Sequence, residues 1–321
     1  MFPMTLARQA CKRCFPICGV NFKMNDQAQA LRERIQQSKR QKGGYPASER
    51  QNKDIYIYSV LSGKGGVGKT NISVNVALAM VKLGKRVLIL DGDIGMTNVD
   101  IIMGAQSKYD IFDYFEGKAS IDEILCDGPG GIKLLSGGSG LLKLDTLNEY
   151  KPNEFLNELL ETVDFDVMII DNGAGISRET LTFTSFAHEA ILVTPPEPTA
   201  ITDAYRVLKA ISFYELKSRV QIIVNRVDNE EEGNAAFTKL KNTADAFLEV
   251  DVQPLGFVTD DNKLEKAVME QVPVNLSYPK STAAREIEAI AKRLVDPEAG
   301  ANSKVSTIDQ FKRRFIKLFG S

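Results

Sequence analysis

The feature that most constrains the fold of this chain is the glycine-rich segment Gly63–Thr70, which reads GKGGVGKT. It follows the apolar, β-rich run 55–61 and opens the amphipathic stretch 69–83. Glycines let a loop wrap closely around phosphate groups and point its backbone N–H groups inward. A helix that begins near Lys69 adds the positive end of its dipole. The segment therefore predicts a strand, a phosphate-binding loop and a helix in direct succession.

The same alternation continues along the chain. Short apolar runs rich in β-branched residues alternate with longer amphipathic stretches, and Ser120–Glu123 has the pattern of a helix capping box. Near-continuous apolar strands are typical of a parallel sheet that is covered on both faces. The pattern predicts an α/β fold with a doubly wound, mostly parallel sheet, and with ligands at the carboxyl ends of the strands. The further expected strands are 86–91, 132–135, 166–171, 190–194, 220–225 and 254–258.

The charge balance and the scarcity of histidine limit the chemistry. The 321 residues include 40 Lys and Arg against 42 Asp and Glu, which argues against nucleic acid as an obligatory partner. No run of about twenty apolar residues predicts a membrane span. His188 is the single histidine, so histidine-activated nucleophiles and His-rich metal sites are not expected. We expect it on a helix, as a surface or packing residue.

Charged side chains at the ends of the expected strands supply the chemistry of a nucleotide site. Lys69 would reach the β- and γ-phosphates, and the Thr70 hydroxyl would hold Mg²⁺. The strand 166–171 ends in Asp171, as a Mg²⁺-binding Walker B strand requires. Asn225–Asp228 reads NRVD after a later strand and resembles the guanine-reading N-K-x-D pattern, so this segment alone leaves ATP and GTP open.

A second lysine inside the loop, Lys64, cannot easily serve its own nucleotide because Lys69 already flanks the phosphates. The sequence KGGVGKT resembles the deviant Walker A motif of the MinD/ParA ATPases, in which this lysine crosses a dimer interface to the partner's phosphates. A charge supplied in trans can contribute roughly 10³–10⁵ in rate. The resemblance implies ATP, Mg²⁺ and a homodimer that forms on ATP. It also implies that Asp93 orients the attacking water, that Asp91 supports the metal shell, and that Gly173–Gly175 senses the γ-phosphate.

The same resemblance assigns the site residue by residue, with Asn225 reading adenine. Asn172 and Thr259 depart from the family pattern, which usually has Thr at the first position and often Pro at the second. The expected catalytic residues are Lys64, Lys69, Asp91 and Asp93, and the expected metal ligands are Thr70, Asp91 and Asp171. The expected nucleotide contacts are Gly63, Lys64, Gly65, Gly66, Val67, Gly68, Lys69, Thr70, Asn71, Asn225, Arg226 and Glu197, the last of which would approach the partner's nucleotide.

Sequence outside the phosphate loop is similar to the FlhG family, also called YlxH or FleN. The similar segments are the D-Q-A-x-x-L-R element, Gly95–Asp100 and Glu197–Tyr205. The resemblance implies control of flagellar number and placement, stimulation of the signal-recognition-particle-type GTPase FlhF, and delivery of flagellar switch-ring proteins. Because the D-Q-A element lies at the extreme N-terminus in FlhG, translation is expected to start at Met24. The expected partner-binding residues are Asp26, Gln27, Ala28, Leu31 and Arg32.

The segments that flank the repeating pattern differ from it in composition. Residues 24–53 are polar, which favours one short helix and a flexible linker; an ordinary solvated helix is the alternative to an activator. Three of the four cysteines fall in the first 23 residues and form no disulfide framework, so the cytoplasm is the expected compartment. The expected division is 1–23 as a non-native extension, 24–53 as activator helix and linker, 54–295 as the P-loop ATPase domain, 296–306 as a linker and 307–321 as an amphipathic helix.

The C-terminal segment has the layout of an interfacial membrane helix, with apolar residues on one stripe and basic residues beside it. One copy should bind an anionic membrane only marginally, because ordering the segment offsets most of the gain from burial. Two copies in an ATP-bound dimer gain avidity of about 10²–10⁴. Docking of the stripe on its own domain is the alternative. The expected membrane residues are Ile308, Phe311, Phe315, Leu318, Phe319, Lys312 and Arg313.

Four other functions are compatible with this fold. A MinD-like division or positioning ATPase would differ only in its partners. A ParA-type DNA partition ATPase needs a basic DNA-binding face, which the charge balance disfavours. An iron–sulfur carrier needs cysteines at its dimer interface, yet Cys126 is the only cysteine after residue 18. A non-enzymatic adaptor that binds ATP structurally is disfavoured by Asp93 together with Lys64.

Overall fold

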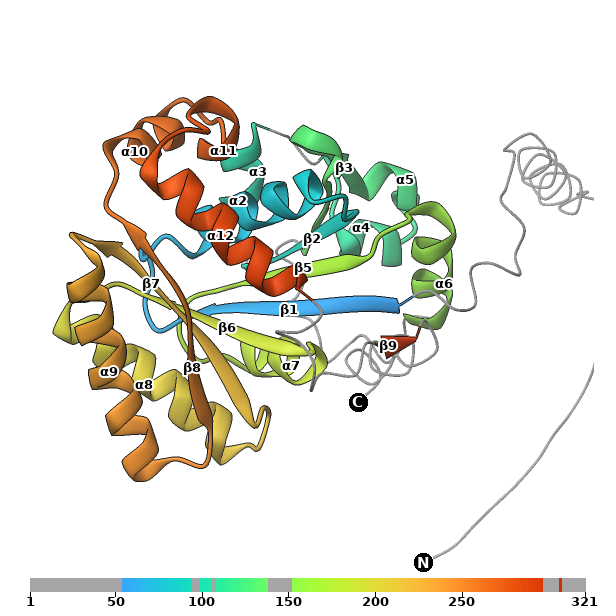
Figure 1. Cartoon of the computed structure of the whole chain (residues 1–321). Helices are drawn as coiled ribbons and strands as arrows, with labels where there is room; N and C mark the ends of the chain where they lie inside the picture. Colours follow the sequence, from blue (N-terminus) through green and yellow to red (C-terminus); the bar gives the residue numbers. More distant parts are fainter. Residues whose placement is uncertain (1–53, 94–97, 105–107, 138–151, 297–305, 308–321) are drawn as a thin grey trace, which may run out of the picture. The chain divides into compact units, whose positions relative to one another are not determined.

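The computed structural model describes residues 54–93, 98–104, 108–137, 152–296 and 306–307. Contacts divide the chain after Arg50, and all described residues belong to the second unit, Gln51–Ser321. They form a sheet with helices on both faces (Figure 1). The short helix expected within residues 24–53 and the expected membrane stripe 308–319 lie outside the described residues. No described helix is long and apolar enough to cross a membrane.

The sheet has the predicted doubly wound, mostly parallel arrangement. Its strands lie in the order β3-β4-β2-β5-β1-β6-β7-β8, and every neighbouring pair along this path is parallel except β3 and β4. The strands are β1 (Asp54–Ser62), β2 (Val87–Gly92), β3 (Leu125–Asp127), β4 (Lys133–Ser136), β5 (Val167–Asn172), β6 (Glu189–Thr194), β7 (Arg219–Val227) and β8 (Asp251–Thr259). All seven expected strands are present, with ends shifted by at most three residues.

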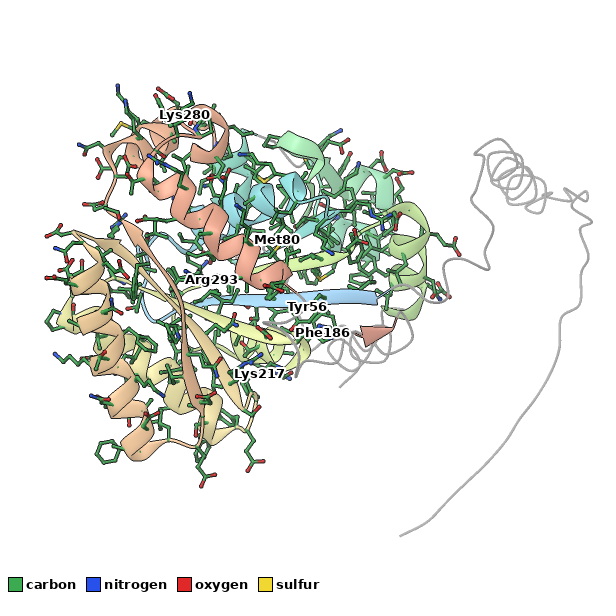
Figure 2. The ribbon with its side chains drawn as sticks, in the orientation of Figure 1. Tyr56, Met80, Phe186, Lys217, Lys280 and Arg293 are labelled. Carbon is green, nitrogen blue, oxygen red and sulfur yellow. The ribbon has the colours of Figure 1, made fainter. Side chains whose placement is uncertain are left out.

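Helices cover both faces because alternate residues of each strand point to opposite sides. One face carries α2 (Lys69–Lys82), α3 (Asn98–Met103), α10 (Asn262–Met269), α11 (Val274–Ser277) and α12 (Thr282–Val295). The other carries α4 (Ile111–Phe115), α5 (Ile121–Ile124), α6 (Pro152–Thr162), α7 (Arg178–Phe186), α8 (Pro198–Phe213) and α9 (Glu230–Phe247). Met80 packs on the first face and Phe186 on the second (Figure 2).

Side-chain caps fix several helix starts. The predicted capping box is confirmed, since the Ser120 backbone N–H donates to Glu123 at 2.8 Å. Asn229 caps α9 and Ser281 caps α12 with their side-chain oxygens. Polar side chains at these positions satisfy N–H groups that lack partners within the helix. Local sequence therefore determines where these helices begin.

Three features differ from the expectations. Strand β3 and the two-residue strand β9 (Ser306–Thr307) were not predicted, and β9 pairs antiparallel with the start of β1. It falls where the expected linker 296–306 meets the expected C-terminal helix. His188 lies after α7 ends, so its predicted place on a helix is wrong. Its ring packs against Tyr56 with centroids 5.0 Å apart, and its Nδ1 accepts the Ile57 N–H at 2.9 Å, so a packing role is confirmed.

Candidate nucleotide site

The glycine-rich loop joins the carboxyl end of β1 to α2, as predicted. Gly66 and Gly68 have φ angles of 75° and 90°, which side chains rarely adopt. A Cβ atom on Gly63 would lie 2.4 Å from the Asp203 carbonyl carbon of α8, so only glycine permits this approach. Gly68 is the N-cap of α2 and supplies no side-chain cap. The first N–H groups of α2 therefore suit a phosphate.

Asp171 is the centre of the polar network behind the loop. Its carboxylate is fully buried and accepts hydrogen bonds from the Thr70 hydroxyl at 2.8 Å and the Ser73 hydroxyl at 2.7 Å. The Lys69 ammonium lies 3.1 Å from the same carboxylate and forms a buried ion pair with it. A buried carboxylate and a hydroxyl at this spacing are oxygen donors of the kind that Mg²⁺ prefers. The structure thus brings together the predicted lysine and two of the three predicted metal ligands.

Asp91 lies beside Asp171 at the end of the neighbouring strand, where the two residues are in register. Burial, and then the negative charge of Asp171, raise the pKa of the Asp91 carboxyl to about 7, although backbone N–H groups and Lys69 oppose the shift. Its Oδ1 accepts the Asp93 N–H at 3.1 Å. Asp91 therefore holds the chain leading to Asp93, and its role at the metal site stays a prediction.

Asp93 shares an open pocket with the phosphate loop. A Cβ atom on Gly173 would lie 3.2 Å from the Asp93 carboxylate, so this acid faces the segment predicted to be the switch. The pocket is lined by Ser62, Gly65, Gly66, Val67, Gly68, Lys69, Thr70, Asn71, Asp93, Ile101, Ile102, Ala174, Arg226 and Val268. The pocket is therefore bounded by the phosphate loop, by Asp93, by the segment predicted to be the switch and by the end of β7. Such an arrangement can bind a phosphorylated nucleotide.

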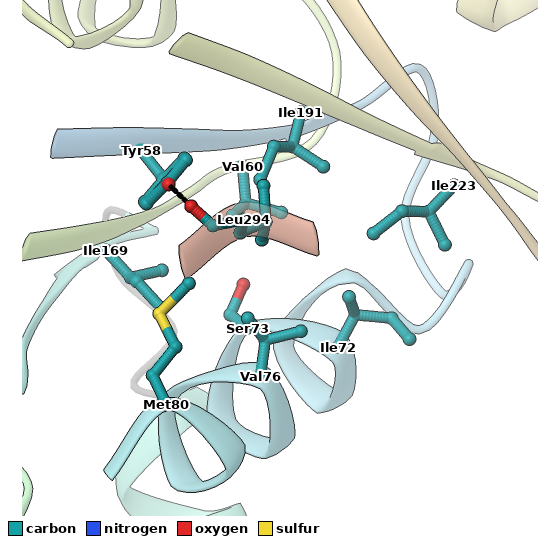
Figure 3. Close-up of a pocket in the computed structure, with 10 residues that line it drawn as sticks. All are labelled: Tyr58, Val60, Ile72, Ser73, Val76, Met80, Ile169, Ile191, Ile223 and Leu294. Atoms are coloured by element: carbon teal, nitrogen blue, oxygen red, sulfur yellow. Dashed lines mark hydrogen bonds between the residues drawn. The ribbon is translucent and has the colours of Figure 1, made fainter. Parts of the chain in front are cut away.

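A separate apolar hollow lies behind the loop, between the sheet, α2 and α12 (Figure 3). Its lining residues are Tyr58, Val60, Ile72, Ser73, Val76, Met80, Ile169, Ile191, Ile223 and Leu294. The Tyr58 hydroxyl donates to the Leu294 carbonyl at 2.6 Å, and the Ser73 hydroxyl donates to Asp171. Because the side-chain hydroxyls in its wall already have partners, this hollow offers no group to a phosphate. It is a feature of core packing.

Two buried asparagines hold the loop and the strand that leads into it. Asn225 is 2% exposed, and its side-chain amide donates to the Val67 carbonyl at 2.8 Å. The predicted reader of adenine thus holds the loop from behind, a contact that sequence reasoning missed; a base contact stays a prediction. Asn172, which replaces the usual Thr, donates to the Ser59 hydroxyl at 2.9 Å and the Val60 carbonyl at 2.8 Å. Asn172 thereby ties β5, the strand that leads into Gly173–Gly175, to β1.

Six predicted residues lie outside the pocket lining; Asp91, Asp171 and Asn225 are described above, and the others are Gly63, Lys64 and Glu197. Gly63 packs against α8, and Glu197 is an exposed residue at the N-cap of that helix. Lys64 is half-buried, and its ammonium forms no ion pair or hydrogen bond with any residue that the structure describes. That Lys64 serves the nucleotide of a second copy stays a prediction.

Sequence reasoning missed several residues at the site. Ser73 could have been found from its spacing, because it follows Lys69 by one helical turn on α2. Ile101 and Val268 enter the pocket from α3 and α10, and no local motif marks either of them. Glu286 of α12 accepts the Thr259 N–H at 2.7 Å and the Thr259 hydroxyl at 2.8 Å. These two hydrogen bonds hold Thr259, the position at which the MinD/ParA family often has proline.

Comparisons with known proteins agree with this geometry. Residues 54–295 match the ParA family model, described as NUBPL iron-transfer P-loop NTPase. The antiactivator FleN of Pseudomonas aeruginosa is 35% identical over 82% of this chain and 94% of its own length. The flagellum site-determining protein YlxH of Helicobacter pylori is 32% identical over 82% of this chain and 90% of its own. The structure of Pyrococcus horikoshii MinD with Mg-ADP is 26% identical, with a TM-score of 0.59, and covers 78% of this chain and 100% of that one.

These findings confirm the resemblance to the FlhG (YlxH, FleN) proteins and the MinD-type fold. Among the described residues Cys126 is a free cysteine, and no three His, Cys, Asp or Glu side chains form a cluster that could hold a metal ion. The same family is indicated by the phosphate loop, by the Walker B aspartate, by the strand order and by the sequence identity to these relatives. The chain therefore belongs to the ParA/MinD family of P-loop NTPases.

Proposed function

We propose that this ATPase dimerises on ATP, hydrolyses it with Mg²⁺, and regulates the number or placement of flagella. The observation that carries the dimer is Lys64, a lysine of the phosphate loop whose ammonium has no partner among the described residues. Lys69 already neutralises its own Walker B acid. A second cation at the loop is therefore available to the nucleotide of a second copy.

The residues present fit a Mg²⁺-dependent reaction. Thr70 and Asp171 would hold the ion, which neutralises charge on the β- and γ-phosphates when bound. Lys69 binds the phosphates from the start of α2, and Asp93 orients the water from across the pocket. Lys64 of the partner copy then stabilises the charge that develops on the transferred phosphoryl group. Asp91 holds Asp93 in place through the 3.1 Å backbone hydrogen bond.

Exposed apolar side chains around the pocket support association at this face. We define the apolar rim as Ile101, Val268 and Met269, which are 54%, 38% and 83% exposed. Two of them also line the nucleotide pocket. A second copy that closed over the pocket would cover this surface, and exposed apolar patches commonly mark such contacts.

A mixing experiment tests whether Lys64 acts in trans. Lys64→Ala and Asp93→Ala should each be inactive alone. In a mixed dimer, the site of the Lys64→Ala subunit keeps its own Asp93 and receives Lys64 from its partner. An equimolar mixture should therefore recover about one quarter of wild-type phosphate release, because half the dimers are mixed and each has one intact site. If Lys64 acts in cis, both sites of the mixed dimer are defective and the mixture stays inactive.

The flagellar role rests on the N-terminal D-Q-A element and on the similarity to YlxH and FleN. A peptide of residues 24–40 should stimulate GTP hydrolysis by purified FlhF, and a peptide with Gln27 and Arg32 changed to Ala should not. If a control peptide from a known FlhG stimulates FlhF and the peptide of residues 24–40 does not, the flagellar role is refuted. The surviving candidate would then be a MinD-like positioning ATPase, which the likeness to Pyrococcus horikoshii MinD favours.

We further propose that the C-terminal stripe attaches the ATP-bound dimer to the cytoplasmic membrane surface. Full-length protein should sediment with anionic vesicles in ATP and much less in ADP, because two copies bind with avidity. Phe311→Glu places a charge in the apolar stripe and should abolish sedimentation while leaving ATP binding intact. Sedimentation that is equal in ATP and ADP would contradict control by dimerisation.

A further inference from the structure

Arg226 has an unusual backbone conformation at the edge of the nucleotide pocket. It lies near the end of β7, where the pairing with β8 shifts register between Asn225 and Val227. The shift leaves Arg226 as an extra residue, a β-bulge, with a φ of 60°. This region favours glycine, so an arginine there costs roughly 1 kcal/mol or more. Arg226 nevertheless lines the pocket, so the bulge directs a cationic residue to it.

The neighbouring strand fixes this bulge. Val227 pairs with Thr259 directly after the register shift, and the Asp260 N–H donates to the Val227 carbonyl at 2.9 Å. Thr259 is the last residue of β8 and precedes α10, which brings Val268 to the same pocket. The position of Thr259 therefore determines where both Arg226 and Val268 lie.

Glu286 holds Thr259 with both oxygens of its carboxylate. It accepts the backbone N–H at 2.7 Å and the hydroxyl at 2.8 Å, and both interactions are partly shielded from water. Hydrogen bonds to an ionised acceptor are stronger than those between neutral groups. A second bond from Arg293 of α12 to the Leu255 carbonyl anchors the same helix on β8. The clamp thus rests on a helix that is fixed against the sheet.

We propose that Glu286 is a positioning residue for nucleotide binding: through Thr259 it holds the wall formed by Arg226 and Val268 against the base and ribose. This inference rests on the proposed ATPase function and adds a residue that does not itself line the pocket. It separates the pocket into a phosphate half, held by Asp171, and a base half, held by Glu286.

Binding of ATP and of tripolyphosphate to full-length protein tests the proposal, with Mg²⁺ present and calorimetry as the readout. Glu286→Gln should weaken ATP about five- to tenfold, because one charge-assisted bond is lost. Tripolyphosphate has no base or ribose, so its affinity should stay unchanged. The KM for ATP should rise by the same factor, with kcat within about twofold of wild type. Thr259→Val keeps the N–H bond and should show a smaller change of the same kind.

Glu288→Gln is the matched control. Glu288 lies on the same helix and is also half-buried, but it pairs with Lys82 at 2.8 Å instead of with β8. It should leave the affinity for ATP unchanged even if it lowers the unfolding temperature. Equal weakening of ATP and tripolyphosphate by Glu286→Gln, equal weakening of ATP by both variants, or no weakening at all would each overturn the inference. Wild-type protein that binds no ATP would instead overturn the proposed function, and the inference with it.

Discussion

Replacement of Asp91 by Asn should change how stability depends on pH. Asp91 is 2% exposed and its pKa is raised to about 7, against an ordinary value of 3.8. Asparagine has nearly the same shape and keeps an oxygen that can accept the Asp93 N–H. The variant therefore removes the titration and leaves the local packing in place.

The sign follows from the direction of the shift. Between pH 4 and 7 the folded protein keeps a proton on Asp91 that the unfolded chain has lost. Stability is therefore fully present below the unfolded pKa and falls as pH rises through this window. A shift of about 3 units corresponds to a loss of at most about 4 kcal/mol, of which about 3 kcal/mol falls between pH 5 and 8.

Urea denaturation of wild type and Asp91→Asn, in EDTA and without nucleotide, measures this contribution at pH 5, 6, 7 and 8. Other acids titrate in both proteins, so the difference between the two unfolding free energies isolates Asp91. The variant should gain on the wild type steadily as pH rises and should be the more stable protein at pH 8. A difference that stays constant within about 0.5 kcal/mol from pH 5 to 8 would refute a raised pKa at Asp91.

Three further predictions concern the two halves of the pocket. Gly63→Ala should lower the free energy of unfolding by about 1–3 kcal/mol and weaken ATP binding at least tenfold, because its Cβ would lie 2.4 Å from the α8 backbone. Gly65→Ala is the control: the space around its Cβ is open, so the thermal unfolding temperature should stay unchanged. Arg226→Gly should raise the free energy of unfolding by about 0.5–1 kcal/mol by relieving the positive φ, yet weaken ATP; a loss of stability would contradict strain at the bulge. Asp171→Asn should raise the Mg²⁺ concentration needed for half-maximal phosphate release about tenfold or more, and an unchanged Mg²⁺ titration would exclude Asp171 as a ligand.

The parts of the site that were predictable are those in which the required residues are adjacent in sequence. Gly63–Thr70 carries its own strand, turn and helix signals, and Asp171 ends an apolar strand, so both were placed correctly. The bond from Asn225 to the Val67 carbonyl joins residues far apart in sequence, and no local pattern encodes such an approach. Thr259 and Glu286 are likewise separated in sequence, and no local motif marks the hydrogen bonds between them.

The shortest elements were also beyond local prediction. β3 and β9 have three and two residues, too few for the alternation that identifies a strand. His188 was expected on a helix, yet its imidazole continues the pairing of β1 and β6 by accepting a backbone N–H. Three expectations stay predictions: that the D-Q-A element binds a partner, that the C-terminal stripe binds a membrane, and that Lys64 acts in trans.

The supports of the pocket differ in how they depend on the rest of the chain. The phosphate half is held by β1 and β5, two central strands of the sheet, and by the start of α2. The base half depends on β8, an edge strand, and on α12, a helix near the end of the described chain. An edge strand has one neighbour, so Glu286 and Arg293 supply from the helix part of what a second strand would supply from the sheet. Variation in α12 can therefore change how the base is held without touching the catalytic residues, which is a route by which members of one ATPase family could differ in nucleotide affinity while they share the same phosphate chemistry.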